Sequence, residues 1–389
     1  MNVLGIVAEY DPFHNGHLFH LTEAKKLVSP AWTCVALSPC VKQRGSLPLL
    51  SPSDRASCAL EAGADAVYAL PALWTLREAE NYALGAVSML AGLGVTHLAF
   101  GAETVDLTLL RKAAGLLEDP TPSFNSLLKE QLLPGIGWPG AVSRAVSTVL
   151  PKAAGLLDRP NNILAVCYLR AILKLGVSIT PVPIPRAGNY HASGIVPSAP
   201  SASALRDALR QGNYAEPFAA VPEYTADLLR RRFLEGRIPD ESILDSVLLA
   251  RLRSMSEAEY RLLPGVSEGM ENALREAAVT CTSRRELIAA VTGKRYPSSR
   301  ISRLCAFALL GVTRDVLLKT SRPESALLLG FRKNADMTAR WKDLPVRVVS
   351  SFSEWAKKAP PAELAAWRLW AQCCRLPDTL PYTEKMITV

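Results

Sequence analysis

The stretch GIVAEYDPFHNGHLFH, residues 5–20, decides the fold. It begins within an apolar run, Val3 to Ala8, that has the length of a buried parallel strand. Asp11 and Pro12 end this strand, and from His17 onward the spacing of apolar residues predicts a helix. The sequence therefore places two histidines at a strand-to-helix turn, where free backbone N–H groups and the helix dipole favour anions.

This turn has the features of a phosphate site. Gly16 removes the side chain that would keep a phosphate away from the backbone. His14 and His17 could donate to an α-phosphate as charge builds up during displacement of pyrophosphate. Taken alone, the four residues also fit two ordinary turn histidines with a capping Asn15. The strand before them and the helix after them favour the phosphate site.

Strand and helix patterns alternate through the first half of the chain. The predicted strands are Val3 to Ala8, Thr33 to Ser38, Ala66 to Leu70, His97 to Gly101 and Ile179 to Ile184. Such alternation predicts an α/β fold with a Rossmann-like parallel sheet that binds its ligand at the carboxyl ends of the strands. We predict an ATP-binding domain over residues 1–214, followed by a mainly α-helical, basic domain over residues 215–389.

Several polar segments follow the predicted strands. The loop from Ser38 to Gly45 carries two cations, and it either closes over a triphosphate or is merely solvated. Asn161 and Asn162 open a helix, as caps or as amides that face a base or a ribose. Arg186 could bind phosphate or stack on adenine.

The second half of the chain reads as helical and basic. Helical patterns cover Glu241 to Arg253, Val266 to Ala277, Ser283 to Thr292 and Ser299 to Leu310, and residues 344–389 read as a terminal helical segment. Residues 281–350 hold 14 Lys and Arg against 5 Asp and Glu, whereas the remainder of the chain holds 30 against 31. A basic surface of this kind fits a polyanion, with nucleic acid as the first candidate and a solvated helical surface as the alternative. The predicted RNA contacts are Lys294, Arg295, Arg300 and Arg303, beside an aromatic side chain.

Composition excludes several classes of protein. No apolar run approaches the roughly 18 residues of a membrane span, and the chain begins without a basic leader region, so we expect a cytoplasmic protein. The eight cysteines form no CxxC pair, which favours reduced thiols over a metal site. A zinc site built from His14, His17, His20 and His191 lacks an acidic or Cys partner at ligand spacing, so we predict no protein-bound metal.

His-Asn-Gly-His resembles the HxGH signature of the nucleotidyltransferases, a superfamily shared with class I aminoacyl-tRNA synthetases. In order along the chain, the sequence is similar to the bacterial tRNA(Met) cytidine acetate ligase family. The matching stretches are residues 5–17, Lys42-Gln43-Arg44-Gly45, Gly63-Ala64-Asp65 with Leu70-Pro71, Leu93-Gly94-Val95 with Phe100-Gly101-Ala102-Glu103, Pro160-Asn161-Asn162-Ile163-Leu164, Ser201 to Arg206, Leu263 to Asn272, and Gly293-Lys294-Arg295-Tyr296. The last two lie in the basic domain.

The resemblance implies an enzyme that joins acetate to AMP from ATP and passes the acetyl group to N4 of the wobble cytidine of elongator tRNA(Met). It implies a nucleotidyltransferase-like first domain, ATP as substrate, Mg²⁺ carried with the nucleotide, and no need for acetyl-CoA. His14 and His17 would be catalytic. The ATP-binding residues that it implies are Ile6, Val7, Ala8, Glu9, Tyr10, Asp11, Pro12, Phe13, His14, Asn15, Gly16, His17, Leu18, Phe19, Gly101, Asn161, Asn162, Arg186, Ser201, Ser203 and Arg206.

The sequence departs from the family pattern at three places. Asp11 stands where Asn is expected, Ser38-Pro39-Cys40 replaces a Ser-Gly-Asn-like loop start, and residues 51–54 lack an expected Lys. A carboxylate at Asp11 would repel phosphates unless it binds Mg²⁺ or faces away. Two alternative functions stay open at this point, a small-molecule adenylyltransferase and a non-catalytic RNA-binding protein. The oligomeric state cannot be inferred from the sequence.

Overall fold

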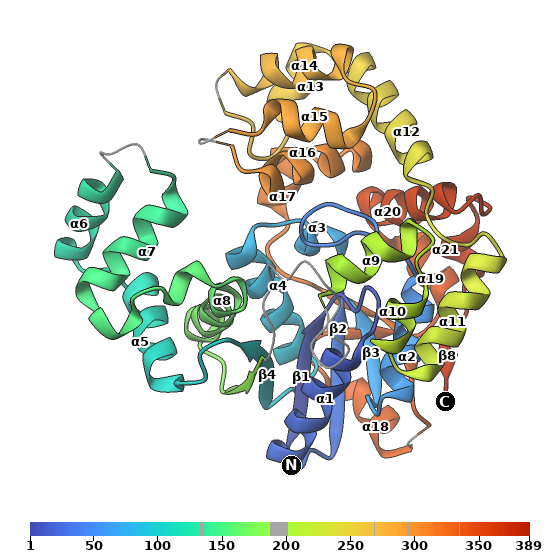
Figure 1. Cartoon of the computed structure of the whole chain (residues 1–389). Coiled ribbons are helices and arrows are strands. Elements are labelled where there is room, and N and C mark those ends of the chain that lie inside the picture. Colours follow the sequence, from blue (N-terminus) through green and yellow to red (C-terminus); the bar gives the residue numbers. More distant parts are fainter. Residues whose placement is uncertain (133–135, 187–200, 268, 294–295, 334) are drawn as a thin grey trace.

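The computed structural model describes residues 1–132, 136–186, 201–267, 269–293, 296–333 and 335–389. A sheet forms its centre, and Figure 1 shows its strands β1 to β4 side by side. The strand order is β5-β4-β1-β2-β3-β6-β7, and β8 pairs with β6 outside this order. The strands are β1 (Val3–Ala8), β2 (Trp32–Leu37), β3 (Ala66–Ala69), β4 (His97–Ala102), β5 (Thr180–Pro185), β6 (Ser325–Phe331), β7 (Arg347–Val349) and β8 (Ile387–Thr388). Only the pairing of β3 with β6 is antiparallel among these described strands.

The five strands predicted from the sequence are present, each with ends within one residue of the prediction. All five run parallel to their neighbours from β5 through to β3, which confirms the α/β fold class. Residues on one strand alternate between two hydrophobic clusters: Val35 and Leu37 join one, while Cys34 and Ala36 join the other. Successive side chains of a strand point to opposite faces, so the sheet is covered on both sides.

Helices cover both clusters, and the sheet lies between them. On one face lie α1 (Asn15–Val28) and α2 (Pro52–Glu61), and on the other lie α4 (Ala79–Gly92) and α8 (Pro160–Leu175). The helices α5 (Leu107–Glu118), α6 (Pro122–Leu132) and α7 (Trp138–Val149) extend away from the sheet on the side of α8 (Figure 1). The remaining helices are α3 (Ala72–Thr75), α9 (Ala202–Arg210), α10 (Ala215–Ala219), α11 (Glu223–Leu234), α12 (Glu241–Ser254), α13 (Glu257–Leu262), α14 (Met270–Thr280), α15 (Arg284–Val291), α16 (Ser298–Leu310), α17 (Arg314–Lys319), α18 (Ala335–Arg340), α19 (Phe352–Lys358), α20 (Pro361–Cys373) and α21 (Leu380–Thr383).

The region after residue 215 is mainly α-helical, as predicted, but it also contains strands that the sequence patterns did not predict. These strands, β6, β7 and β8, join the central sheet. The β6 segment SALLLGF is a short apolar run rich in Leu, and periodicity does not distinguish such a run from part of a buried helix. The proposed boundary between residues 214 and 215 stays a prediction, but the last 65 residues are not purely helical.

The helical region packs directly on the sheet domain. One hydrophobic cluster contains Leu21 of α1, Leu248 of α12, Leu304 of α16, and Trp367 and Trp370 of α20. Both tryptophans are only 1% exposed. None of the helices in the described ranges combines the length and the apolar character that a membrane crossing requires.

Candidate active site

The loop between β1 and α1 carries both predicted catalytic histidines. His14 is the N-cap of α1, and its Nδ1 accepts a hydrogen bond from the His17 backbone N–H at 3.3 Å. In return, His17 Nδ1 accepts from the His14 backbone N–H, also at 3.3 Å. The two rings stack with their centroids 3.6 Å apart. This reciprocal cap fixes both imidazoles at the N-terminus of the helix.

The hydrogen bonds also fix the protonation state of the rings. Because each Nδ1 accepts a hydrogen bond, the proton of the neutral imidazole is on Nε2. Burial, with Arg186 nearby, lowers the pKa of His14 to about 3, and burial lowers the pKa of His17 well below its ordinary value. His14 Nε2 is buried and has no hydrogen-bond partner among the described residues. His14 therefore presents a neutral N–H donor, which suits an anion that gains charge during a reaction.

Acid is expected to destabilise the ligand-free chain through His14. An unfolded histidine has a pKa near 6.5, so between about pH 6.5 and about pH 3 the unfolded state binds a proton that the folded state does not. The stabilising contribution of neutral His14 is complete above this range and decreases by about 1 kcal/mol per pH unit as the pH falls through it. Urea unfolding at about pH 5 and about pH 7 measures this slope. His14→Asn, which keeps a capping acceptor, should show a shallower slope, and parallel slopes would contradict the assignment.

Two arginines from different elements flank these histidines. Arg186 follows β5, and Arg206 lies on α9; both contribute to the lowered pKa of His14. Gly101, near the end of β4, borders the same space, since a Cβ added there would lie 3.9 Å from His20 Cδ2 and 4.0 Å from Arg186 Cδ. The carboxyl ends of β1, β4 and β5 therefore bring together the residues that the sequence predicts for an ATP site.

The paired asparagines at the start of α8 have different surroundings. Asn161 Oδ1 accepts from Arg186 Nη1 at 2.7 Å, and its Nδ2 donates to Glu103 Oε1 at 2.6 Å. Asn162 is 1% exposed, and its Oδ1 accepts from the Thr104 N–H at 2.9 Å. Asn161 therefore orients Arg186 within the crevice, whereas Asn162 fastens α8 to the segment that follows β4.

A cavity of about 740 Å³ opens beside this group. Glu103, Lys152, Arg159, Asn162 and Arg186 are among the residues that line it. Its volume lies within the range of small-molecule sites, and its lining mixes cations with hydrogen-bonding groups. The arrangement suits a nucleotide.

The second predicted phosphate motif also reaches the histidine loop. Arg206 Nη1 donates to the Asp11 backbone oxygen at 2.7 Å, and Arg206 Nη2 donates to Ser203 Oγ at 3.0 Å. Ser201 is the N-cap residue of α9. Residues 187–200, which include His191, lie outside the described residues.

The apolar residues of the stretch from Ile6 to Phe19 include members of the hydrophobic core. Ile6, Ala8 and Phe13 are buried in the hydrophobic core, so that only their backbone atoms could meet a nucleotide. Asn15 donates from its backbone N–H to Ala220 O at 3.0 Å, which ties the start of α1 to the segment after α10.

Asp11 is buried and does not face open solvent. It is 2% exposed, its Oδ2 accepts from Lys42 Nζ at 2.6 Å, and its Oδ1 accepts from the Leu49 N–H at 2.7 Å. Burial alone would raise the pKa of Asp11, but Lys42, Arg206 and Arg55 together lower it to about 2. The carboxylate is therefore ionised, and both of its oxygens accept hydrogen bonds from protein donors.

The loop between β2 and α2 is held from several sides. Arg55, fully buried, donates to the backbone oxygens of Glu9, Ser38 and Leu50, and Trp370 Nε1 donates to Pro48 O at 2.9 Å. Lys42 itself is only 4% exposed. The interpretation of the loop as a solvated segment is therefore wrong for Lys42, and its closure over a triphosphate stays a prediction.

His20 is a site residue that the sequence analysis did not assign to ATP. It lies one helical turn after His17, its Nε2 is buried without a partner among the described residues, and burial with nearby Arg186 lowers its pKa to about 4. The spacing of His14, His17 and His20 on one helix face is the signal that could have identified it. In the part of the chain that the structure describes, no group of three or more His, Cys, Asp or Glu side chains could hold a metal ion.

The structure describes two of the four predicted RNA contacts, Arg300 and Arg303. Arg300 Nε donates to Gly265 O at 3.0 Å, and its guanidinium lies 5.4 Å from the Tyr296 ring centre. Burial lowers the pKa of Arg303; the carboxylate of Glu78 opposes this shift, and Arg300 and Arg44 add to it. Lys294 and Arg295 lie outside the described residues.

Known proteins share both the sequence and this architecture. The family model of the HIGH nucleotidyl transferases matches residues 1–375. The tRNA(Met) cytidine acetate ligase of Fervidobacterium nodosum is 33% identical, covering 95% of this chain and 90% of its own length. The enzyme of the same name from Syntrophomonas wolfei is 35% identical, covering 85% and 82%.

Solved structures agree with these relatives. Crystal structures of Thermotoga maritima TmcAL, apo and bound with alpha-thio ATP, superpose with TM-scores of 0.92 and 0.91 at 28% identity, over the whole of both chains. The match thus includes the helical region as well as the sheet. The chain belongs to the HIGH nucleotidyl transferases and, within them, to the tRNA(Met) cytidine acetate ligase family.

Proposed function

We propose that this chain activates acetate with ATP and acetylates N4 of the wobble cytidine of elongator tRNA(Met). In the first step an acetate oxygen bonds to the α-phosphorus while the bond to pyrophosphate breaks, which gives acetyl-adenylate. In the second step the cytidine N4 bonds to the acetyl carbon, AMP leaves, and N4 loses a proton. The names of the relatives support this reaction, and a tRNA substrate is consistent with a cytoplasmic enzyme.

The observation that carries the proposal is the pair of stacked, neutral histidines at the N-terminus of α1, where the buried Nε2 of His14 has no partner among the described residues. Charge develops on the α-phosphate as pyrophosphate departs, and donors that are already oriented need no rearrangement at that moment. Arg186 and Arg206 approach from other elements, and they suit the remaining phosphate charge of ATP.

The described residues do not fit a dedicated magnesium site at the histidine loop. Asp11 has both carboxylate oxygens on protein donors, and no cluster of acidic or histidine ligands occurs among the described residues. We propose that Mg²⁺ arrives with the nucleotide and is held by its phosphates. No step assigned to this chain's residues requires a protein ligand to the metal.

Labelled acetate, ATP and tRNA should together give labelled tRNA. The decisive measurement is exchange of labelled pyrophosphate into ATP, with and without acetate. Exchange that depends on acetate supports acetyl-adenylate formation, whereas exchange that depends on a phosphorylated metabolite would support a small-molecule adenylyltransferase. Absence of exchange with every acid would point to a non-catalytic protein.

Arg300 is expected to contact an RNA phosphate. The affinity of the protein for tRNA should fall steeply as the salt concentration rises. Arg300→Gln should weaken tRNA binding several-fold and reduce the slope of log affinity against log salt concentration by about one. Filter binding across a salt series measures both quantities. Arg347→Gln is the matched control, because Arg347 lies on β7 and pairs with Glu354. An equal change of slope in both variants would refute the placement of RNA on α16.

A further inference from the structure

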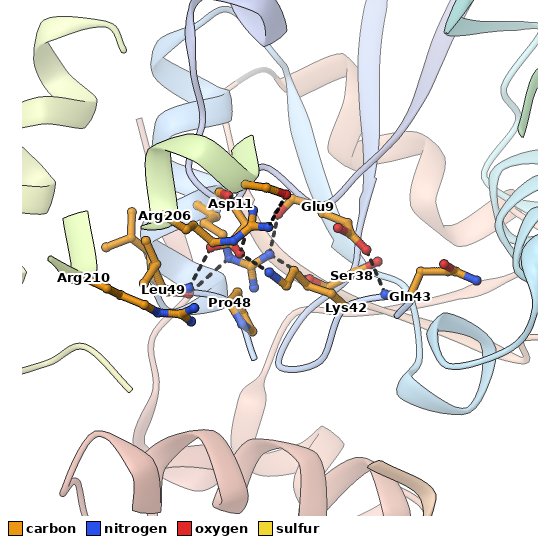
Figure 2. A network of polar contacts seen from close by, with 12 residues as sticks. Glu9, Asp11, Ser38, Lys42, Gln43, Pro48, Leu49, Arg206 and Arg210 are labelled. Atoms are coloured by element: carbon orange, nitrogen blue, oxygen red, sulfur yellow. Dashed lines mark hydrogen bonds and ion pairs between the residues drawn. The ribbon is translucent and has the colours of Figure 1, made fainter. Parts of the chain in front are cut away.

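A buried ion pair lies beside the candidate phosphate site. The side chains of Lys42 and Asp11 are 5% and 1% exposed, and Lys42 Nζ lies 2.6 Å from Asp11 Oδ2. Figure 2 shows Arg206 and Lys42 both directed at Asp11, Arg206 from α9 and Lys42 from the β2–α2 loop. Asp11 is three residues before His14, so a carboxylate charge lies next to the loop that would hold a triphosphate.

Arg206 has two possible partners on Asp11. Its Nη1 donates to the backbone oxygen at 2.7 Å and lies 3.6 Å from the carboxylate Oδ2. The shorter contact is with a neutral carbonyl, and the carboxylate is instead closest to Lys42. A guanidinium bound to a carbonyl keeps its charge for a ligand, whereas one paired closely with a carboxylate does not.

We propose that Lys42 is a positioning residue of the phosphate site: by neutralising the carboxylate of Asp11, it leaves the guanidinium of Arg206 on the Asp11 backbone oxygen, available to the β- and γ-phosphates of ATP. The proposal rests on the proposed function, in which Arg206 binds these phosphates. It assigns a role to the charge at Asp11, which the anion site alone does not explain. The pair acts on the substrate through Arg206 and does not touch it.

Two other roles for the pair make different predictions. An ion pair that only stabilises the fold would respond similarly to loss of either partner. A carboxylate that binds Mg²⁺ would make Asp11 itself essential, with Lys42 secondary. Positioning by charge neutralisation is asymmetric, because only loss of Lys42 exposes a negative charge to the phosphates.

The test compares Lys42→Met, Lys42→Arg, Asp11→Asn and the double variant Asp11→Asn/Lys42→Met. In Lys42→Met the KM for ATP and for pyrophosphate should rise about tenfold or more in acetate-dependent exchange, with kcat much less affected. In Asp11→Asn both KM values should stay within about threefold of the parent, although the thermal midpoint falls because Lys42 becomes a buried unpaired charge. The double variant and Lys42→Arg should restore both KM values to within about threefold.

A partly buried ion pair elsewhere in the chain supplies the control. Asp54 on α2 and Arg232 on α11 are joined at 2.7 Å, with side chains 9% and 21% exposed. Asp54→Asn and Arg232→Met should lower the thermal midpoint without the change in KM. They report what the loss of a partly buried ion pair does to this chain in general.

Equal KM changes in Lys42→Met and Asp11→Asn, or no KM change in either, would overturn the proposal in favour of a structural pair. Loss of turnover in Asp11→Asn and in the double variant, with Lys42→Met active, would overturn it in favour of a metal ligand. If Lys42→Met does not fold, the KM values of Lys42→Arg and the double variant decide, since a defect in both contradicts the proposal. Failure of the proposed function would appear as a lack of acetate-dependent pyrophosphate exchange in the parent protein. The role of Arg206 is tested separately, by calorimetric measurement of ATP binding to the parent and to Arg206→Gln.

Discussion

Replacing His17 by alanine is expected to lower kcat for acetate-dependent pyrophosphate exchange by about 100- to 1000-fold. His17 is neutral, it is held by the His14 N–H, and it carries its proton on Nε2. A donor of this kind contributes most when charge develops on the α-phosphate, so its loss affects the transition state more than the bound nucleotide. The KM for ATP should therefore change far less than kcat.

The control for this variant is a histidine at the amino end of a strand, away from the candidate site. His97 begins β4, and its Nδ1 lies 2.8 Å from Thr96 Oγ1, remote from the carboxyl ends of the strands. His97→Ala should exchange pyrophosphate at nearly the parent rate. If His17→Ala raised the KM for ATP without lowering kcat, the ring would be a binding group and the transition-state role would be wrong.

A chain that ends at residue 324 is expected not to fold. The truncation removes β6, which lies between β3 and β7, and leaves the short, fully buried strand β3 as a bare edge. It also removes α20, whose Glu363 accepts hydrogen bonds from the N–H groups of Ala72 and Leu73, and whose Trp367 and Trp370 are almost fully buried. Loss of either tryptophan side chain alone costs about 3–5 kcal/mol, a large part of the stability of an ordinary domain.

The amount of soluble protein and a cooperative urea transition measure this prediction. A chain shortened only by residues 386–389 is the control, because it loses little beyond β8, which forms two residue pairs with β6. It should remain folded with a lower thermal midpoint. A soluble fragment 1–324 or 1–214 with a cooperative transition would show that the sheet is complete without its C-terminal strands.

The parts of this fold that local sequence encodes were predictable. An apolar run, a turn with Gly16 between two histidines, and a helix-compatible spacing identify β1, α1 and the phosphate site, because the chemistry and the turn lie within 16 consecutive residues. The return of β6 to the sheet depends on a partner strand more than 250 residues away, and no local pattern records such a pairing. The leucines of β6 suit a helix equally well.

Asp11 shows the same limit within the site. From the sequence it is a carboxylate beside a phosphate loop. Its partner Lys42 is 31 residues away, in a loop that the sequence predicts either to close over a triphosphate or to be solvated. Arg55 and Trp370, which fasten that loop, bind it through backbone oxygens. Backbone acceptors are present at every residue, so the sequence gives no sign of which ones a buried donor will choose.

The shared core has a mechanical consequence for the RNA. Leu21 beneath the histidine loop and Leu304 of α16 belong to one close-packed cluster, and packed interiors do not deform continuously. Among the described residues this shared core opposes a hinge motion between the histidine loop and α16, so under the proposed function we expect the distance between the adenylate and α16 to change little. Under the proposed reaction the anticodon loop must deform instead, with the wobble cytidine leaving its stack at a cost of a few kcal/mol. Selection among tRNAs would thus depend on how easily each anticodon loop opens, in addition to the bases that it presents.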